Sequence, residues 1–123
     1  MDYDNSQPIY MQIIDEYKKS IIRNELKKGD KIPSQREYAQ RVRVNPNTVQ
    51  RAYREMENMN MVETLRGQGT FIIAGEQMRE QMVNDMAGQL MRHFISEMRS
   101  LGYEDMVTMD MLKQEFESLE EDE

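Results

Sequence analysis

The sequence predicts a mainly α-helical fold with one small β-hairpin. Three features support this prediction. Apolar residues recur at helical spacing in five separate stretches. A glycine-rich turn, GQG, lies between two short segments rich in β-branched and apolar residues. The last of the long stretches, after residue 76, is rich in methionine and keeps the helical spacing for about 24 residues.

Length and charge predict two regions. The 123 residues allow one domain of ordinary size, or one small domain with an appendage that needs a partner to cover its apolar face. Residues 1–75 hold 12 Lys/Arg and 10 Asp/Glu, whereas residues 76–123 hold 4 and 13, in a chain of net charge −7. We therefore expect one domain over residues 1–75 and a second, acidic region over residues 76–123, with the acidic region facing away from any polyanion.

The composition argues against several functional classes. The chain has no cysteine, one histidine, no phosphate-binding loop and no paired metal-ligand spacing, so we expect no enzyme activity, no metal and no cofactor. It shows neither a basic start followed by an apolar run nor eighteen consecutive apolar residues, so no membrane contact is expected. The sequence is interpreted as that of a soluble cytoplasmic protein.

The first helix is predicted over residues 8–26. Pro8 suits a first helical turn, and a single apolar stripe follows it, made by Tyr10, Ile13, Ile14, Tyr17 and Ile21. Gly29 is expected to end the helix. The segment KGDKIP then predicts a turn leading into a short extended piece, because the residue before Pro33 disfavours helical geometry.

Two short helices are predicted next. Ser34 and Glu37 form a capping box for a helix over residues 35–42, and Asn45 followed by Pro46 begins a helix over residues 46–58. The second helix has an inward face of Val49, Ala52, Tyr53 and Met56. Its other face carries Asn47, Thr48, Gln50, Arg51 and Arg54, with Asn45 at the tip. This arrangement describes a helix-turn-helix.

The segments MVETLR and TFII predict a β-hairpin after this motif. Its turn contains Arg66, Gly67 and Gln68, so a basic side chain lies at the tip of a ribbon narrow enough to approach a DNA groove. A hairpin in this position is the wing of a winged helix-turn-helix.

The polar face of the helix over residues 46–58 favours DNA reading over a merely solvated face. Asn and Gln amides can pair with adenine in two places, and Arg can do so with guanine. Arg36 lies in the first turn of its helix, where the helix dipole disfavours a cation, so an anionic partner such as a DNA phosphate is indicated.

The second region predicts two helices with an apolar stripe. Leu101-Gly102 is expected to end the first, and Thr108 to cap the second. About 40 helical residues cannot bury that stripe alone, so we expect a homodimer. Expected interface residues are Met78, Met82, Met86, Leu90, Phe94, Met98, Leu112 and Phe116. Two alternatives are a pocket for a hydrophobic effector and a Cu(I) site built from Met78, Met82, Met86 and His93.

Three segments together resemble a known family. PIYMQI, KKGDKIPSQREYA and VNPNTVQRAYREMENMNMVETLRGQGTFI, within residues 8–73, are similar to the DNA-binding region of the GntR family of bacterial transcription regulators, and the short tail resembles its YtrA-like branch. The resemblance implies a winged helix-turn-helix homodimer on a palindromic operator, commonly a repressor relieved by a small molecule. It also implies control of transporter genes.

The resemblance implies DNA contacts at particular residues. These are Arg36, Asn45, Asn47, Thr48, Gln50, Arg66 and Gly67, and the residue patterns add Arg51 and Gln68. At Pro46 and Gln50 many relatives carry arginine, so adenine-directed amides are expected here in place of guanine contacts. Two other hypotheses are an architectural DNA-binding protein without sequence preference and a protein-interaction module.

Overall fold

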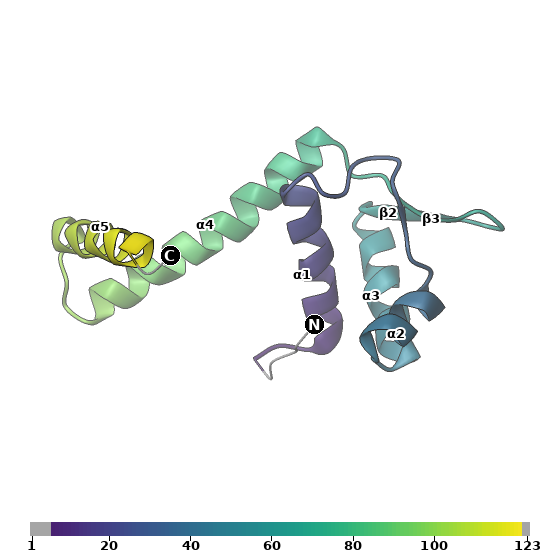
Figure 1. Ribbon diagram of the computed structural model, residues 1–123, viewed down its shortest axis with the longest axis horizontal. Coiled ribbons are helices and arrows are strands. Elements are labelled where there is room, and N and C mark those ends of the chain that lie inside the picture. Colours follow the sequence, from purple (N-terminus) through teal and green to yellow (C-terminus); the bar gives the residue numbers. More distant parts are fainter. Residues whose placement is uncertain (1–5, 122–123) are drawn as a thin grey trace. The chain divides into compact units, whose positions relative to one another are not determined.

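The computed structural model describes residues 6–121, within which lie five helices and three strands (Figure 1). The helices are α1 (Ile9–Ile22), α2 (Gln35–Val42), α3 (Pro46–Asn58), α4 (Glu76–Ser100) and α5 (Asp105–Glu121). The strands are β1 (Lys31–Ile32), β2 (Val62–Leu65) and β3 (Gly69–Ile72). The chain divides inside α4 into two compact units, Met1–Met82 and Val83–Glu123. The predicted fold class is confirmed.

Helix α1 ends four residues earlier than the sequence predicted. It stops at Ile22, and the Arg23 N–H still donates to the Lys19 carbonyl. Asn24 then adopts a φ of 61°, a left-handed conformation that asparagine tolerates and that cannot continue a right-handed helix. The apolar stripe alone could not reveal this stop.

Helices α2 and α3 begin and end where the sequence predicted. The Glu37 N–H donates to Ser34 Oγ at 3.1 Å and the Ser34 N–H to Glu37 Oε1 at 3.4 Å, which completes the capping box. Arg43, with a φ of 57°, ends α2 in a left-handed conformation. The Asn47 N–H donates to Asn45 Oδ1 at 2.8 Å, so Asn45 caps α3.

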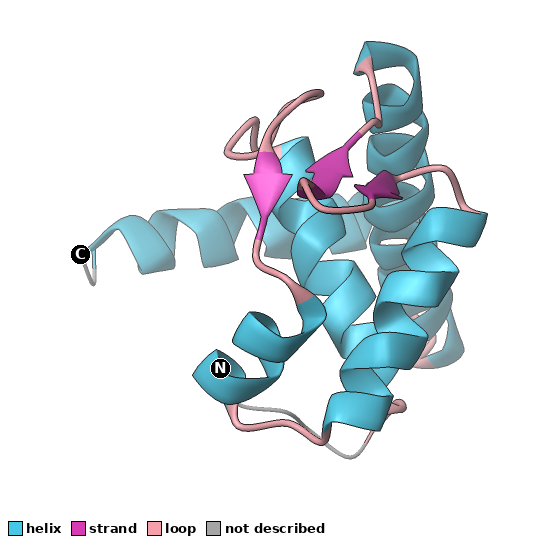
Figure 2. Cartoon of the chain, turned by 90° about the vertical axis from the view of Figure 1, so that its right-hand side faces the viewer, coloured by secondary structure: helices cyan, strands magenta, loops and turns pink. Residues whose placement is uncertain are grey.

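The hairpin belongs to a three-stranded antiparallel sheet of order β1-β3-β2 (Figure 2). The extended piece predicted before Pro33 forms the additional strand, with Ile32 opposite Thr70. The Gly29 N–H donates to the Ile72 carbonyl at 2.7 Å, and the Ile72 N–H to the Asp30 carbonyl at 2.8 Å. The sequence predicted an extended segment here but not its pairing with β3.

Three tyrosine rings join the helices of the first unit. The ring centroids of Tyr17, Tyr38 and Tyr53 lie 5.5 to 6.1 Å apart, at angles typical of aromatic packing. The Tyr53 hydroxyl donates to the Pro33 carbonyl at 2.6 Å. Because its one proton is used there, the Tyr17 hydroxyl must donate to the Tyr53 oxygen, 2.8 Å away. Helix α3 is thus tied to α1 and to the segment before α2.

The first turns of α4 belong to the first unit. Arg79 Nε and Nη2 donate to the Ile22 carbonyl at 3.0 and 2.8 Å, which satisfies an orphan carbonyl at the end of α1. Met82 is only 5 % exposed in the core of this unit, and Met78 packs against that core. Both methionines were expected at a dimer interface, but their own subunit already covers most of each side chain.

The second unit contains the rest of α4 and helix α5. The expectation that Thr108 caps the last helix is wrong, because α5 begins at Asp105 and Thr108 lies buried within it. An acidic residue in the first turn suits the helix dipole. Arg99 also binds Asp105 through two hydrogen bonds of 2.9 and 2.8 Å, and these bonds hold the pKa of the Asp105 carboxyl below its usual range.

Candidate nucleic-acid interface

Helix α3 exposes a ridge of polar side chains along its first turns. Asn47, Gln50 and Arg54 are exposed, while Val49 and Ala52 are fully buried beneath them. Within residues 6–121, the side chains of Asn47, Gln50 and Arg54 form no hydrogen bond or ion pair. Their donors and acceptors are therefore available to an external partner.

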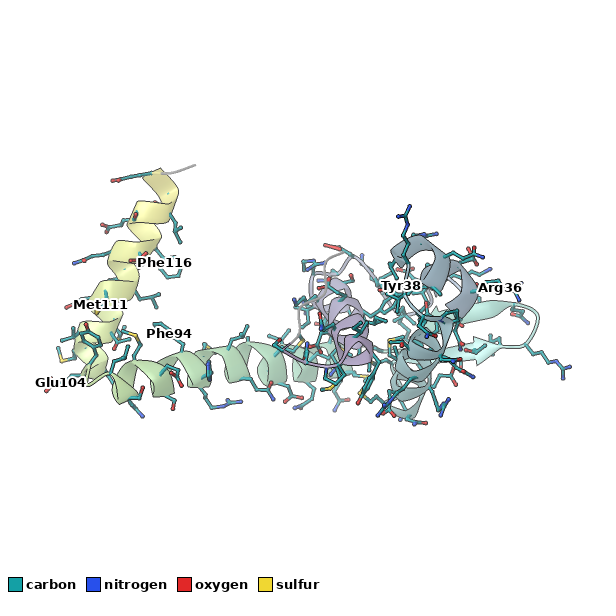
Figure 3. All side chains as sticks on the ribbon, turned by 90° about the horizontal axis from the view of Figure 1, so that it is seen from below. Arg36, Tyr38, Phe94, Glu104, Met111 and Phe116 are labelled. Carbon is teal, nitrogen blue, oxygen red and sulfur yellow. The ribbon has the colours of Figure 1, made fainter. Side chains whose placement is uncertain are left out.

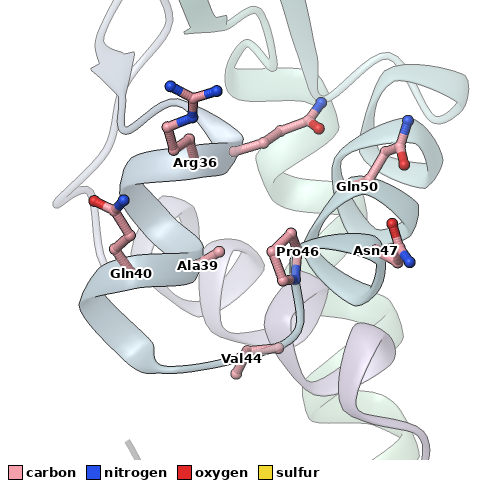
Figure 4. A pocket seen from close by; sticks show the side chains of 8 residues that line it. Arg36, Ala39, Gln40, Val44, Pro46, Asn47 and Gln50 are labelled. Carbon is pink, nitrogen blue, oxygen red and sulfur yellow. The ribbon is translucent and has the colours of Figure 1, made fainter.

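A groove of about 650 Å³ runs between α2 and α3 (Figure 4). Arg36 projects from the α2 side, Asn47 and Gln50 from the α3 side, and Ala39 and Val44 contribute apolar lining between the helices. Arg36 is exposed and makes no hydrogen bond or ion pair among the described residues. The structure thus brings three of the predicted site residues to one groove.

Two predicted site residues, Asn45 and Thr48, are only partly available to an external partner. Asn45 uses its side-chain oxygen as the cap of α3, so only its amide NH₂ and the second lone pair of that oxygen remain for other contacts. Thr48 is half-buried at the start of α3, on the side that turns toward α1.

Arg51 is held against α1 by an aromatic side chain. Its guanidinium carbon lies 3.9 Å from the centre of the Tyr10 ring, and its Nη2 donates to the Tyr10 hydroxyl at 3.3 Å. A cation over a tyrosine face is attracted by the ring quadrupole. This contact orders Arg51 beside Thr48 and the start of α1, away from the α2–α3 groove, with the side chain still exposed.

The hairpin of β2 and β3 projects from the helices of its unit (Figure 1), and its tip carries Arg66, Gly67 and Gln68, all exposed. Gly67 has a φ of 79° and Gly69 a φ of 125°, backbone conformations that favour glycine. A Cβ on Gly69 would lie 2.7 Å from Lys31 Cε, so the Lys31 stem crosses closely over this glycine. Lys31 thus adds a second cation to the wing, next to Gly69.

The base of the wing is hydrogen-bonded to α3. The Thr64 hydroxyl donates to Glu57 Oε1 at 3.0 Å, so its oxygen accepts from the Thr70 hydroxyl, also 3.0 Å away. Thr64 lies on β2 and Thr70 opposite it on β3. The wing and α3 therefore form one connected surface.

Some residues of this surface were absent from the predicted site. Arg54 continues the α3 ridge, Gln35 and Gln40 line the groove from α2, and Lys31 lies at the wing. Helical spacing did place Arg54 on the polar face, two turns after Asn47, although it was not predicted as a DNA contact. The position of Lys31 depends on the pairing of β1 with β3, which no local pattern shows.

The surface combines amides, guanidinium groups and a thin basic ribbon. Amides and arginines on an exposed helix can read base edges in the major groove, and cations around them bind phosphates. Among residues 6–121 no group of three or more His, Asp or Glu side chains could hold a metal ion. No helix in this part of the chain has the length and hydropathy needed to cross a bilayer.

The fold and this surface define a DNA-binding winged helix-turn-helix protein. The family model described as "Bacterial regulatory proteins, gntR family" matches residues 9–72. The chain belongs to the GntR family of transcriptional regulators. The family members to which it is similar are regulators and not enzymes.

Two similar proteins come from one bacterium. The HTH-type transcriptional regulator YhcF of Bacillus subtilis (strain 168) is 43 % identical over 100 residues, 81 % of this chain and 83 % of YhcF. The HTH-type transcriptional repressor YtrA of the same organism is 49 % identical over 72 residues, 58 % of this chain and 55 % of YtrA.

Solved structures share the fold over most of the chain. A GntR family transcriptional regulator from Listeria monocytogenes has a TM-score of 0.84 at 39 % identity, covering 91 % of this chain and 98 % of its own. The DNA-binding domain of AraR, solved in complex with operator ORR3, has a TM-score of 0.52 at 24 % identity, covering 58 % of this chain and 87 % of its own, and shares the fold.

Proposed function

We propose that this regulator is a homodimeric repressor that binds a palindromic operator through α3, Arg36 and the wing. Repression is proposed because the similar protein YtrA is a repressor. The observation that carries the proposal is the ridge of Asn47, Gln50 and Arg54, exposed and without intramolecular partners among the described residues. A surface of free amides and guanidinium groups beside a basic wing fits the edges and backbone of a DNA major groove.

The residues of the surface divide between base reading and phosphate binding. Asn47 and Gln50 offer amides that pair with adenine, and Arg54 offers a fork that pairs with guanine. Arg36, at the rim of the groove, and Arg66, at the tip of the wing, are proposed to bind phosphates or the adjacent minor groove. Arg51 is ordered by Tyr10 and lies beside the start of α1. It is proposed to contact the DNA backbone there.

Dimerisation is supported by the apolar surface of the second unit. Phe116 on α5 is 60 % exposed and Leu90 on α4 is 73 % exposed. Figure 3 shows Phe94, Met111 and Phe116 standing on these two helices. Further exposed apolar side chains of this unit include Leu101, Met106, Val107 and Leu119. Contiguous apolar surface on a small protein marks an interaction site, and a second copy would cover it.

The proposed dimer fixes the geometry of the operator. Two α3 helices related by a twofold axis enter successive major grooves on one side of the duplex, so the half-sites lie about one helical turn, roughly 10 base pairs, apart. A small molecule that binds more tightly to a dimer geometry in which the two α3 helices no longer match the half-site spacing would relieve repression, with coupling of about 1 to 3 kcal/mol between the two sites.

The electrostatic part of the proposal is tested by replacing Arg36 with alanine. The loss of one phosphate contact per subunit, two in the proposed dimer, should weaken binding to all sequences and reduce the slope of log affinity against log salt by about 2. Fluorescence anisotropy with an operator duplex and a scrambled duplex, at several salt concentrations, gives both slopes. Arg23→Ala is the control, since Arg23 is exposed at the far end of α1 and paired with Glu25.

Three results would contradict the proposal in different ways. An unchanged slope in Arg36→Ala would remove α2 from the interface. Equal affinity of the parent protein for operator and scrambled duplexes would favour an architectural DNA-binding protein. An absence of salt-dependent affinity for any duplex would favour a module that binds other proteins.

A further inference from the structure

The second unit contains a small apolar pocket between α4 and α5. Its volume is about 290 Å³, near the lower end of the range for small-molecule sites. Five of its lining side chains are apolar: Met91, Phe94, Ile95, Met109 and Leu112. Phe94 lies on α4 close to the end at which the chain turns into α5 (Figure 3). All of the lining residues belong to Val83–Glu123, so the pocket is a feature of this unit alone.

One polar side chain in this pocket lacks a partner. Thr108 lines the pocket and is only 7 % exposed, and its hydroxyl oxygen forms no hydrogen bond within residues 6–121. A buried hydroxyl without a partner is destabilising, and most buried hydroxyls are therefore bonded. In a helix, threonine populates two χ1 rotamers, so a rotation about one bond can turn this hydroxyl toward the pocket.

The charged groups at the pocket are already neutralised. Arg99 and Asp105 also line it, but they bind each other through two hydrogen bonds. They therefore offer no unpaired charge to an ionic ligand, and their link joins the end of α4 to the start of α5. Met91 and Met109 are unbranched and polarisable, so they can adapt to ligands of different shape.

We propose that this pocket binds an uncharged small molecule with a compact apolar body and one hydroxyl group, which pairs with the Thr108 hydroxyl. The apolar lining supplies the affinity and the single threonine supplies the polar selectivity. The site concerns the second unit only, and its test needs no DNA. A failure of this inference is therefore distinguishable from a failure of the DNA-binding proposal.

The experiment uses the full chain with methyl-labelled methionine and follows the methionine methyl signals by NMR. The probes are p-ethylphenol and p-ethyltoluene, which differ by a hydroxyl in place of a methyl group. We expect p-ethylphenol to shift the signals of Met91 and Met109 in a saturable manner. Met56 and Met61, fully buried in the first unit, serve as internal controls whose signals stay in place.

The variant Thr108→Val keeps the shape of the side chain and removes its hydroxyl. It should weaken the binding of p-ethylphenol roughly 5-fold, the effect of one neutral hydrogen bond, and leave p-ethyltoluene unaffected. A second variant, Leu112→Trp, should fill the pocket and abolish both responses. Because the Thr108→Val comparison uses two probes on one variant, it stays informative even if Leu112→Trp does not fold.

Either of two results would overturn the proposal. One is the absence of shifts at Met91 and Met109 up to the solubility limit of p-ethylphenol, as expected if a second copy of the chain fills the pocket. The other is that Thr108→Val weakens the binding of both probes equally, or of neither, since the hydroxyl would then have no part in recognition.

Discussion

At the scale of single residues, Tyr53 shows how α3 is held in position. Its hydroxyl is an acceptor for Tyr17 and a donor to the Pro33 carbonyl, so one oxygen joins three segments of the first unit. Burial raises the pKa of this hydroxyl to about 12, against a partial lowering by the Tyr17 hydrogen bond. The ring was predicted as core from helical spacing, but the hydrogen bonds depend on partners distant in sequence.

Replacing Tyr53 with phenylalanine should destabilise the fold by about 1 to 3 kcal/mol. The ring remains, but the Pro33 carbonyl and the Tyr17 hydroxyl lose a partner in a buried site. Denaturant unfolding measures the change. Tyr103→Phe, in the exposed connection between α4 and α5, is the matched control and should change the free energy of unfolding by less than about 0.5 kcal/mol.

The same substitution should also change how the free energy of unfolding depends on pH above pH 9. In the unfolded chain a tyrosine loses its proton near pH 10, whereas folded Tyr53 keeps it to about pH 12. Between these values the unfolded state binds fewer protons, so this contribution to stability falls as pH rises, by on the order of 2 kcal/mol in total. Unfolding curves from pH 9 to 12 should fall less steeply for Tyr53→Phe, and parallel curves would contradict the assignment.

At the scale of elements, the sequence predicted those helix ends that are set by capping residues next to them in the chain. The bounds of α2 and α3 follow from Ser34, Glu37 and the Asn45-Pro46 pair, and the structure confirms them. The early end of α1 and the start of α5 were predicted wrongly, because neither depends on the apolar spacing that was used. Strand β1 contains only two residues, and its pairing with β3 joins segments about 40 residues apart, so no local pattern could show it.

The same contrast applies to the interface. The polar face of α3 and the glycine-rich turn were readable from spacing and residue type. The stacking of Arg51 on Tyr10 was not, since it depends on how α1 packs beside α3. The sequence predicted that Asn45 caps α3. The hydrogen bond from the Asn47 N–H shows in addition which atoms of Asn45 remain for base contacts.

The wing offers a test at this scale. Replacing Gly69 with alanine should destabilise the protein by about 1 to 3 kcal/mol, because a φ of 125° strains any residue with a Cβ and the Lys31 side chain must move. Gly75→Ala is the control, since a Cβ there meets nothing within 4 Å and the backbone is unstrained. Thermal unfolding of the two variants compares them, and equal stability would show that the wing turn is not constrained as described.

At the scale of the whole molecule, the two units differ in the surfaces that they expose. The first carries the proposed DNA-binding surface, and the second carries most of the exposed large apolar side chains. Composition and spacing predicted one region over residues 1–75 and a second over residues 76–123, and in the structure Met82 belongs to the core of the first unit. The proposed dimer contact therefore lies further along the chain.

Phe116→Glu should dissociate the proposed dimer. A charge placed in an apolar interface loses its hydration without gaining a partner. Sedimentation should then give the mass of a single chain, 14.7 kDa, whereas the parent protein should give twice that value. Operator affinity should fall about 100-fold, because the second DNA-binding unit is no longer linked to the first. Gln114→Glu adds the same charge on the opposite side of α5 and should leave the dimer intact. A Phe116→Glu protein that stays dimeric would place the contact elsewhere.

The most direct test of base reading by α3 is selection of bound duplexes from a random DNA pool. The parent protein should enrich a palindrome with half-sites roughly 10 base pairs apart. Gln50→Ala should keep that spacing and lose preference at one position in each half-site, by about 1 to 3 kcal/mol, while Asn58→Ala, at the far end of α3, should select the parent sequence. An unselective parent protein, or an unchanged sequence profile in Gln50→Ala, would contradict the account.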